Sequence, residues 1–329
     1  LSCTLAQQRS ERCTLMNKTQ LSELGSTLKQ WYRAGQYYDY QGLSIYYQDS
    51  DSNEINHTGD ALDATSTRPV LLLIHGFPTA SWDWVKIWPQ LSEHYRVVTL
   101  DMIGFGFSDK PVNFKYSIAE QANVFEALLR HLNIKDFHIV AHDYGDTVAQ
   151  ELLHRHARKE HPSGELEIKS VSLLNGGLFP ESHRPKLIQS LLNSPLGSVI
   201  AKVISKRSVD KNMRSIFGQC SQPSEQELEE MWQLISFNNG KRIFHKLIGY
   251  MTERKRFRDR WLSSLTHAKC PIQLINGTAD PISGEHMVKR FETLVSTNNI
   301  LRLENIGHYP QMEAPEQVSG AIISFINKH

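Results

Sequence analysis

Short, uninterrupted apolar runs are the feature that most restricts the folds open to this sequence. Runs of this kind are typical of strands buried on both faces of a parallel sheet. They lie at residues 69–74, 96–101, 137–141, 168–174, 271–275 and 299–303. Helical patterns separate several of them, at residues 82–91, 117–132 and 147–153. This alternation predicts an α/β fold with a doubly wound, mostly parallel sheet.

Local signals predict three further features: a strand pair, a long loop and a helix cap. Residues 37–40 and 43–48 are typical of a strand pair joined by a Gln41-Gly42 turn, and residues 49–67 of a long surface loop. Ser117, followed by Glu120 three residues later, predicts a capping box at the start of the helix 117–132.

A compositional break divides the chain into three parts. From residue 180 to 265 the pattern is helical without strong strands, and this block holds 15 Lys and Arg against eight Asp and Glu. We therefore predict a helical cap at 180–265, inserted into a core formed by residues 37–179 and 266–329. Residues 1–36 form a polar N-terminal segment. We expect the cap to lie over the carboxyl ends of the strands.

Composition excludes several classes of protein. The 329 residues include 36 Lys and Arg and 35 Asp and Glu, and the net charge of +1 gives no reason to expect a nucleic-acid partner. No apolar run approaches the roughly 18–20 residues of a membrane span. The cysteines are too sparse for a disulfide scaffold and lack zinc spacing, which favours reduced thiols in a cytosolic-type compartment. They are Cys3, Cys13, Cys220 and Cys270.

The N-terminus and the glycosylation sequons bear on location. The first 20 residues are polar and contain no signal-peptide core. We expect a cytoplasmic protein from the sequence as it stands. The chain begins with Leu1 rather than Met, and if an upstream anchor is missing we expect a protein at the endoplasmic reticulum membrane. Sequons begin at Asn17, Asn56 and Asn276. We interpret all three as chance matches, since a glycan on Asn276 would lie beside the candidate active site.

The strongest chemical signal is the sequence Ile139-Val-Ala-His-Asp-Tyr-Gly145, an apolar strand that runs into a tight turn and then a helix. This is the context of a nucleophile elbow, in which small residues leave room for a sharp turn that presents the middle side chain. That side chain is Asp143, where the common pattern has Ser. The alternative is a buried Asp143 that caps the following helix.

Two later motifs favour the catalytic interpretation. Asp280 follows the apolar run 271–275, and His308 follows the run 299–303. The chain order nucleophile, acid, base is that of α/β-hydrolase triads. The sequence His75-Gly-Phe-Pro-Thr79 follows the first buried strand, where a backbone donor of an oxyanion hole is expected. The two donors would be the N–H groups of Phe77 and Tyr144, and the Phe77 side chain is as well suited to line a pocket.

These motifs resemble the α/β-hydrolase fold in its epoxide hydrolase and haloalkane dehalogenase branch. The resemblance rests on His75-Gly-Phe-Pro-Thr79, the Asp101–Pro111 stretch, His142-Asp-Tyr-Gly145 and Gly307-His-Tyr-Pro-Gln311. It implies an inserted helical cap, a triad of Asp143, Asp280 and His308, and neither cofactor nor metal. It also implies that cap tyrosines protonate an opening epoxide, and Tyr250 stands where one of that pair is expected. The other tyrosine of the pair has no match.

An aspartate nucleophile limits the chemistry. A carboxylate attacks saturated carbon and leaves an alkyl ester, which His308, oriented by Asp280, would hydrolyse by activating water. The expected substrate is small and apolar, with an electrophilic carbon. The resemblance favours epoxide hydrolysis over dehalogenation. It implies Asn after His-Gly and Trp after the nucleophile in a dehalogenase, and this sequence has Phe77 and Tyr144 at those positions.

Other interpretations stay open at this point. A catalytically idle fold that serves binding or regulation is one, since a fold does not decide function. A Ser-type esterase would need a second elbow, and none is visible. Tyr250 could be a packing aromatic. The basic stretch 253–260 is expected to be a solvated helix face, with contact to an anionic membrane surface as the alternative.

Overall fold

The computed structural model describes residues 21–52, 68–158 and 166–329. Several sequence-based expectations lie outside these residues, among them Cys3, Cys13, the sequons at Asn17 and Asn56, and most of the loop expected at 49–67. The third sequon is described. Asn276 is fully buried, and its side-chain amide donates to the carbonyl oxygens of Gly277 and Ser283. Its surroundings therefore leave no room for a glycan.

An eight-stranded sheet forms the centre of the described structure, in the order β1-β2-β4-β3-β5-β6-β7-β8. The first two pairings, β1 with β2 and β2 with β4, are antiparallel, and the others are parallel. The mostly parallel sheet predicted from the apolar runs is thus confirmed. The strands are β1 Gln36–Tyr40, β2 Leu43–Asp49, β3 Val70–Ile74, β4 Arg96–Leu100, β5 Asp136–His142, β6 Glu167–Leu174, β7 Ile272–Gly277 and β8 Ile300–Leu303.

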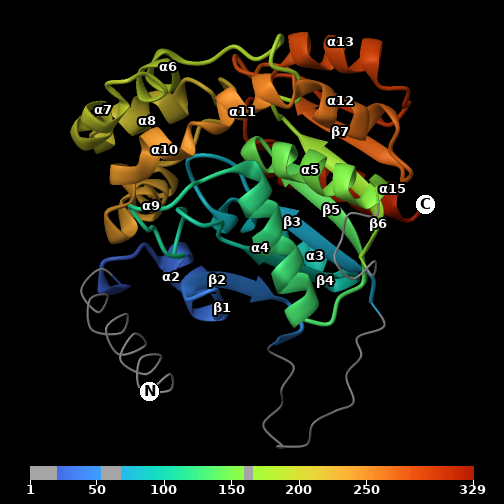
Figure 1. The fold of residues 1–329 in the computed structure, drawn as a ribbon, viewed down its shortest axis with the longest axis horizontal. Coiled ribbons are helices and arrows are strands. Elements are labelled where there is room, and N and C mark those ends of the chain that lie inside the picture. Colours follow the sequence, from blue (N-terminus) through green and yellow to red (C-terminus); the bar gives the residue numbers. More distant parts are fainter. Residues whose placement is uncertain (1–20, 53–67, 159–165) are drawn as a thin grey trace, which may run out of the picture.

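Helices cover both faces of the sheet (Figure 1). Helix α4 packs against α5, which packs against α12, on one face, while α3 and α15 pack together on the other. The helices of the core and its N-terminal flank are α2 Ser26–Ala34, α3 Trp88–His94, α4 Ile118–His131, α5 Tyr144–Arg158, α13 Glu285–Leu294, α14 Pro310–Glu313 and α15 Pro315–Ile326.

Two local expectations need correction. The helix expected at 82–91 is a short 3₁₀ helix, Ser81–Trp84, followed by α3. Pro89 lies in the first turn of α3, where its missing N–H costs nothing, whereas one continuous helix would have lost a hydrogen bond there. At α4 only half of the capping box forms. Ser117 accepts the Glu120 N–H, but the Glu120 carboxylate binds Tyr40 and Asn123 instead of reaching back.

The chain between β6 and β7 consists of helices joined by loops and contains no strand. It contains α6 Leu187–Leu192, α7 Gly197–Val203, α8 Lys206–Arg214, α9 Glu225–Ser236, α10 Phe244–Leu247, α11 Tyr250–Arg256 and α12 Arg258–Thr266, with a 3₁₀ segment at Phe237–Ile243. The Phe244 and Tyr250 rings lie against Phe77, just beyond the carboxyl end of β3. We keep 180–265 as the proposed extent of the cap. In the part of the chain described, no helix is long and apolar enough to cross a bilayer.

The turn between β5 and α5 brings the helix very close to β3. Asp143 has φ of 50°, in the left-handed region that non-glycine residues seldom adopt. Two residues later, a Cβ placed on Gly145 would lie 2.2 Å from the Ile74 carbonyl oxygen. Since this atom belongs to the backbone of a central strand, it cannot move aside. Only glycine allows α5 to begin here.

We therefore expect Gly145→Ala to destabilise the protein by at least about 1–3 kcal/mol, the usual cost of forcing extra volume into a packed core. The matched control is Gly320→Ala in α15, where an added Cβ meets nothing within 4 Å. That change should stabilise by about 0.5–1 kcal/mol through helix propensity. Urea unfolding midpoints measure both, and equal effects at the two sites would contradict the close contact at Ile74.

Candidate active site

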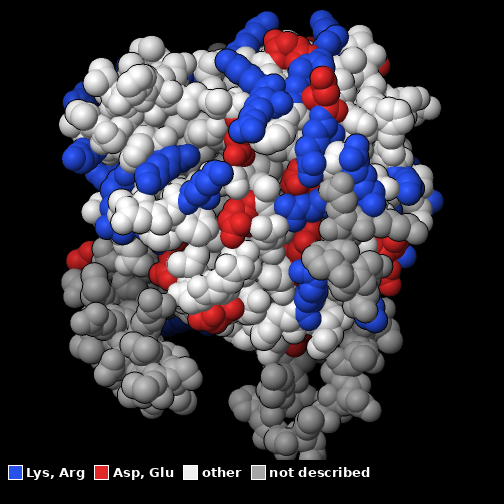
Figure 2. All heavy atoms as spheres, in the orientation of Figure 1, with Lys and Arg blue, Asp and Glu red and all other residues white. Residues whose placement is uncertain are grey.

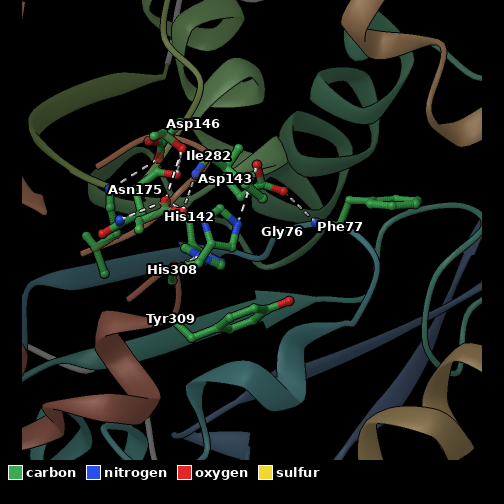
Figure 3. Close-up of polar contacts among 12 residues, drawn as sticks. Gly76, Phe77, His142, Asp143, Asp146, Asn175, Ile282, His308 and Tyr309 are labelled. Atoms are coloured by element: carbon green, nitrogen blue, oxygen red, sulfur yellow. Dashed lines mark hydrogen bonds and ion pairs between the residues drawn. The ribbon is translucent and has the colours of Figure 1, made fainter. Parts of the chain in front are cut away.

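Asp143 lies at the carboxyl end of β5, buried beneath the cap. Its N–H donates to the Leu174 carbonyl of β6, and its Oδ2 accepts the Phe77 N–H at 3.1 Å. Figure 3 shows the carboxylate between the His308 ring and the main chain at Phe77. The acceptor bond goes to Phe77 rather than to the first turn of α5, which argues against the helix-cap interpretation. Of the two expected oxyanion donors, the Phe77 N–H is thus already directed at this carboxylate.

Asp280 and His308 meet this carboxylate from two loops that follow neighbouring strands, β7 and β8. His308 Nδ1 lies 2.7 Å from Asp280 Oδ2, and His308 Nε2 lies 3.9 Å from Asp143 Oδ1. All three side chains are almost completely buried. The predicted convergence of these residues is therefore present in the structure.

The Asp280 carboxylate is fixed by several donors besides the histidine. The Ile282 N–H donates to Oδ1 at 2.7 Å, and the Asn175 amide donates to Oδ2 at 3.0 Å. Burial alone would raise the pKa of Asp280, but His308 and these hydrogen bonds together lower it. The group is accordingly held as an anion that orients the imidazole.

His308 lies between two carboxylates in a buried site. Burial opposes the charged ring, but Asp280 and then Asp143 outweigh it and raise the pKa of His308 to about 9. At neutral pH the ring is therefore an imidazolium as long as both carboxylates are charged. A change that neutralises Asp143 would lower this pKa and free the ring to accept a proton.

Substituting Asp143→Asn should consequently lower the pKa of His308, because an amide of the same shape replaces a nearby negative charge. The imidazole Cε1–H chemical shift, followed by NMR across pH 5–10, measures the change. Asp146→Asn is the matched control. Asp146 is also buried near the start of α5, but it is not among the groups that shift the pKa of His308. A His308 pKa that is unchanged in Asp143→Asn would contradict the electrostatic coupling.

Sequence analysis did not identify two supporting residues, His142 and Asn175. Burial lowers the pKa of His142 to about 3, so the neutral ring donates its Nε2–H to the His308 carbonyl at 2.8 Å. Asn175 stands just after β6 with φ of 44°, and its Oδ1 accepts the Gly277 N–H. Both fix the backbone from which the triad side chains extend. Asn175 was visible as the polar residue that ends an apolar run, the same signal that identified Asp280.

Arg254 is the functional candidate that sequence reasoning missed. It is buried, its guanidinium carbon lies 4.5 Å from the centre of the Tyr250 ring, and its Nε–H donates to Thr147 Oγ1 at 2.8 Å. Another N–H donates to the Asp143 carbonyl at 3.1 Å, and the same nitrogen lies 3.9 Å from Asp143 Oδ1. Its spacing was a usable signal, since residues four apart share a helix face and Tyr250 was already placed toward the site.

The expectation for residues 253–260 is therefore wrong as stated. The stretch is split at Phe257 between α11 and α12, and it is not one solvated face. Arg258 pairs with Glu181, and Arg260 pairs with the buried Glu151 of α5. Lys255 and Arg256 are exposed. From the sequence alone, a run of charged residues is expected to face solvent, because the sequence does not show which partners the fold places beside those residues.

The three expected pocket residues, Phe77, Tyr144 and Tyr250, form one aromatic group. The Tyr250 ring lies 4.7 Å from Tyr144 and 6.4 Å from Phe77, measured between ring centres. Burial, and next the charge of Asp143, raise the pKa of Tyr250, which keeps its hydroxyl protonated. That hydroxyl is buried without a hydrogen-bond partner among the described residues. A buried donor with no partner is available to a substrate oxygen.

A largely apolar cavity extends into the cap from Phe77, whereas Tyr144 and Tyr250 are not among the residues that line it. Its empty volume is about 640 Å³, including the part open to solvent. Phe77 and His308 lie at its inner end, while α6 and α8 supply much of its wall.

The described residues contain no group of three His, Cys, Asp or Glu side chains placed to hold a metal ion. The arrangement thus offers a carboxylate, a histidine and an apolar approach.

Comparison with known proteins agrees with the fold. A family model described as "alpha/beta hydrolase fold" matches residues 69–315. The mouse "Mesoderm-specific transcript protein" is 40% identical over 312 residues, which cover 93% of this chain and 89% of the mouse protein. "Putative hydrolase LipZ" of Mycobacterium tuberculosis is 34% identical over 78% of this chain and 88% of its own.

Solved structures show the same architecture at low sequence identity. The haloalkane dehalogenase DbeA of Bradyrhizobium elkani superposes with a TM-score of 0.69 at 19% identity, over 89% of this chain and 97% of that one. Such a likeness concerns the fold alone.

Proposed function

Because the chain belongs to the α/β-hydrolase fold family, we propose that it is a hydrolase that forms a covalent alkyl ester on Asp143, with epoxides as substrates. The orientation of the Asp143 carboxylate carries this proposal. One oxygen is held by the Phe77 N–H, and the other lies toward His308 and Arg254 at 3.9 Å from each. The free oxygen suits attack on carbon, and the held oxygen suits the later oxyanion. The hydrolase names of relatives agree with this class.

In the first step, Asp143 Oδ1 attacks an epoxide carbon, a carbon–oxygen bond forms and the ring C–O bond breaks. The epoxide oxygen takes a proton from the Tyr250 hydroxyl. As the ester forms, the charge on Asp143 disappears and the pKa of His308 falls. His308 then loses its proton to solvent, and the Tyr250 phenolate takes a proton back from solvent. The products of this step are a neutral imidazole and a hydroxyalkyl ester.

In the second step, His308 takes a proton from water, and the resulting hydroxide attacks Cγ of Asp143. The Phe77 N–H stabilises the negative charge that develops on Oδ2. The intermediate collapses by breaking the bond between Cγ and the alkyl oxygen, and the departing oxygen takes the proton from the new carboxyl group. The diol leaves, and the charged pair of Asp143 and His308 is regenerated. Asp280 holds the imidazolium throughout.

The leaving group separates this proposal from its alternatives. An epoxide oxygen needs a proton, which the unpartnered Tyr250 hydroxyl can supply. A halide needs N–H donors in an apolar pocket and no proton. A binding protein without catalysis would form no ester with either substrate. The experiments below give a different result for each of these three activities.

Substituting His308→Gln should leave the attacking carboxylate intact but remove the base, so that the ester accumulates on Asp143. Loss of a general base slows a step by about 10²–10⁴-fold. Peptide mass spectrometry after incubation with apolar epoxides and haloalkanes would detect the adduct and its mass. Asp143→Asn/His308→Gln should show none, and His94→Gln, at an exposed histidine, should turn over without accumulation. In a single turnover of the wild type in H₂¹⁸O, the label should appear on Asp143; label in the diol would exclude the covalent route.

Tyr250→Phe keeps the ring stacked under Arg254 and removes only the hydroxyl. We expect it to slow ester formation from epoxides by about 10²-fold or more, as loss of a general acid does. Release of a halide from a haloalkane should hardly change, because it needs no proton. Stopped-flow measurement of both reactions compares them within one variant. Equal slowing of the two reactions would show that Tyr250 contributes by packing and not as a proton donor.

A further inference from the structure

The outer surface of α6 and α7 exposes an unusual concentration of large apolar side chains. We call this surface the α6–α7 face; it consists of Leu187 (76% exposed), Leu191 (40%), Leu196 (67%), Val199 (56%) and Val203 (71%). Elsewhere in the described residues only Tyr37 and Val112 are comparably exposed. Contiguous apolar patches of this kind usually mark an interaction site, whereas single exposed residues need no explanation.

Charge is arranged around this face rather than on it. Residues 187–201 contain no charged side chain, and between Glu181 and Asp210 the chain carries cations only. Three of these, Arg184, Lys202 and Arg207, are exposed and form no ion pair with residues that the structure describes. In Figure 2 the region over α6 and α7 is largely uncharged, with blue atoms along its margin. An apolar centre with a cationic margin complements a bilayer with anionic headgroups.

Helix α6 also forms a wall of the cavity. Leu187 and Leu191 face solvent, while Ile188 and Leu192, each one residue further along, line the cavity that ends at His308. The surface patch and the substrate cavity are thus two sides of the same helix. A protein partner could cover the leucines equally well, but it would give no reason for an apolar cavity directly behind them.

We propose that the α6–α7 face docks onto the surface of a lipid bilayer, and that the cavity behind it receives apolar substrate dissolved in that bilayer. The docking is peripheral, with the leucine and valine side chains among the acyl chains and Arg184, Lys202 and Arg207 at the headgroups. The second half of the proposal rests on the proposed function. It narrows the substrate class to epoxides with an apolar chain long enough to prefer lipid over water.

Flotation of the full chain with vesicles tests the docking without any chemistry. Vesicles of phosphatidylcholine with phosphatidylserine should bind the wild type, and Leu187→Ser/Val203→Ser should lower binding by about tenfold or more, as expected for the loss of two buried apolar side chains. Tyr37→Ser, on the edge strand β1, is the control and should bind as the wild type does. Lys202→Gln/Arg207→Gln should weaken binding to anionic vesicles but not to pure phosphatidylcholine.

Several results would overturn the docking. They are wild-type protein that does not float, equal loss of binding in Tyr37→Ser, or a wild type that is dimeric by light scattering and becomes monomeric in Leu187→Ser/Val203→Ser. The last outcome would assign the face to a second copy of this chain.

Turnover then tests delivery. With a long-chain alkyl epoxide held in vesicles, Leu187→Ser/Val203→Ser should reduce hydrolysis by about as much as it reduces binding. With water-soluble styrene oxide the same variant should match the wild type, since neither residue lines the cavity. Equal loss on both substrates would overturn delivery from the bilayer. If the protein floats but hydrolyses neither substrate, the proposed function fails while the docking stands.

Discussion

The contact on which the candidate site depends is the approach of α5 to the carbonyl of Ile74, where Gly145 has no side chain to hold the two apart. This contact permits the tight turn in which Asp143 adopts its positive φ. It also brings the loop after β3 close enough for the Phe77 N–H to reach Oδ2. The position of the proposed nucleophile and the hydrogen bond to its carboxylate therefore both depend on this backbone contact.

Burial then gives the charges around Asp143 their influence. In water, charges about 4 Å apart interact by roughly 1 kcal/mol, and in a dry site the interaction is several times larger. Here two carboxylates and one imidazole share such a site, and the pKa of His308 responds to both. The protonation state of His308 can accordingly follow the charge of Asp143. In the proposed reaction, His308 would lose its proton and become a base only after an ester has removed the charge of Asp143.

Much of the sheet could be predicted from the sequence, because strands buried on both faces are continuously apolar and cannot be mistaken for surface helices. The proposed triad positions followed from the same signal, since Asp143, Asp280 and His308 each lie within five residues of the end of such a run. The cap was harder. Arg254 looked like one more charge in a basic stretch, although it is buried against Thr147 and Tyr250. Charged residues reveal their surroundings only when their partners, far away in sequence, are known. Glu120 shows the same difficulty, because its distant partner Tyr40 draws it away from its local role.

The ties between the cap and the core are distributed unevenly, and this has a consequence for motion. Arg254 is bound to Thr147, while Arg260 and Trp261 are bound to Glu151, so the last part of the cap is held to α5 by several hydrogen bonds. Among the described residues the side chains of α6 and α7 form no hydrogen bond to the core, and that of Gln189 accepts the N–H of Lys186 within the cap. We therefore expect motion of the cap relative to the core to be easiest at α6 and α7, beside the cavity. The helices that line the cavity and the segment that is bound to α5 are thus different parts of one insertion.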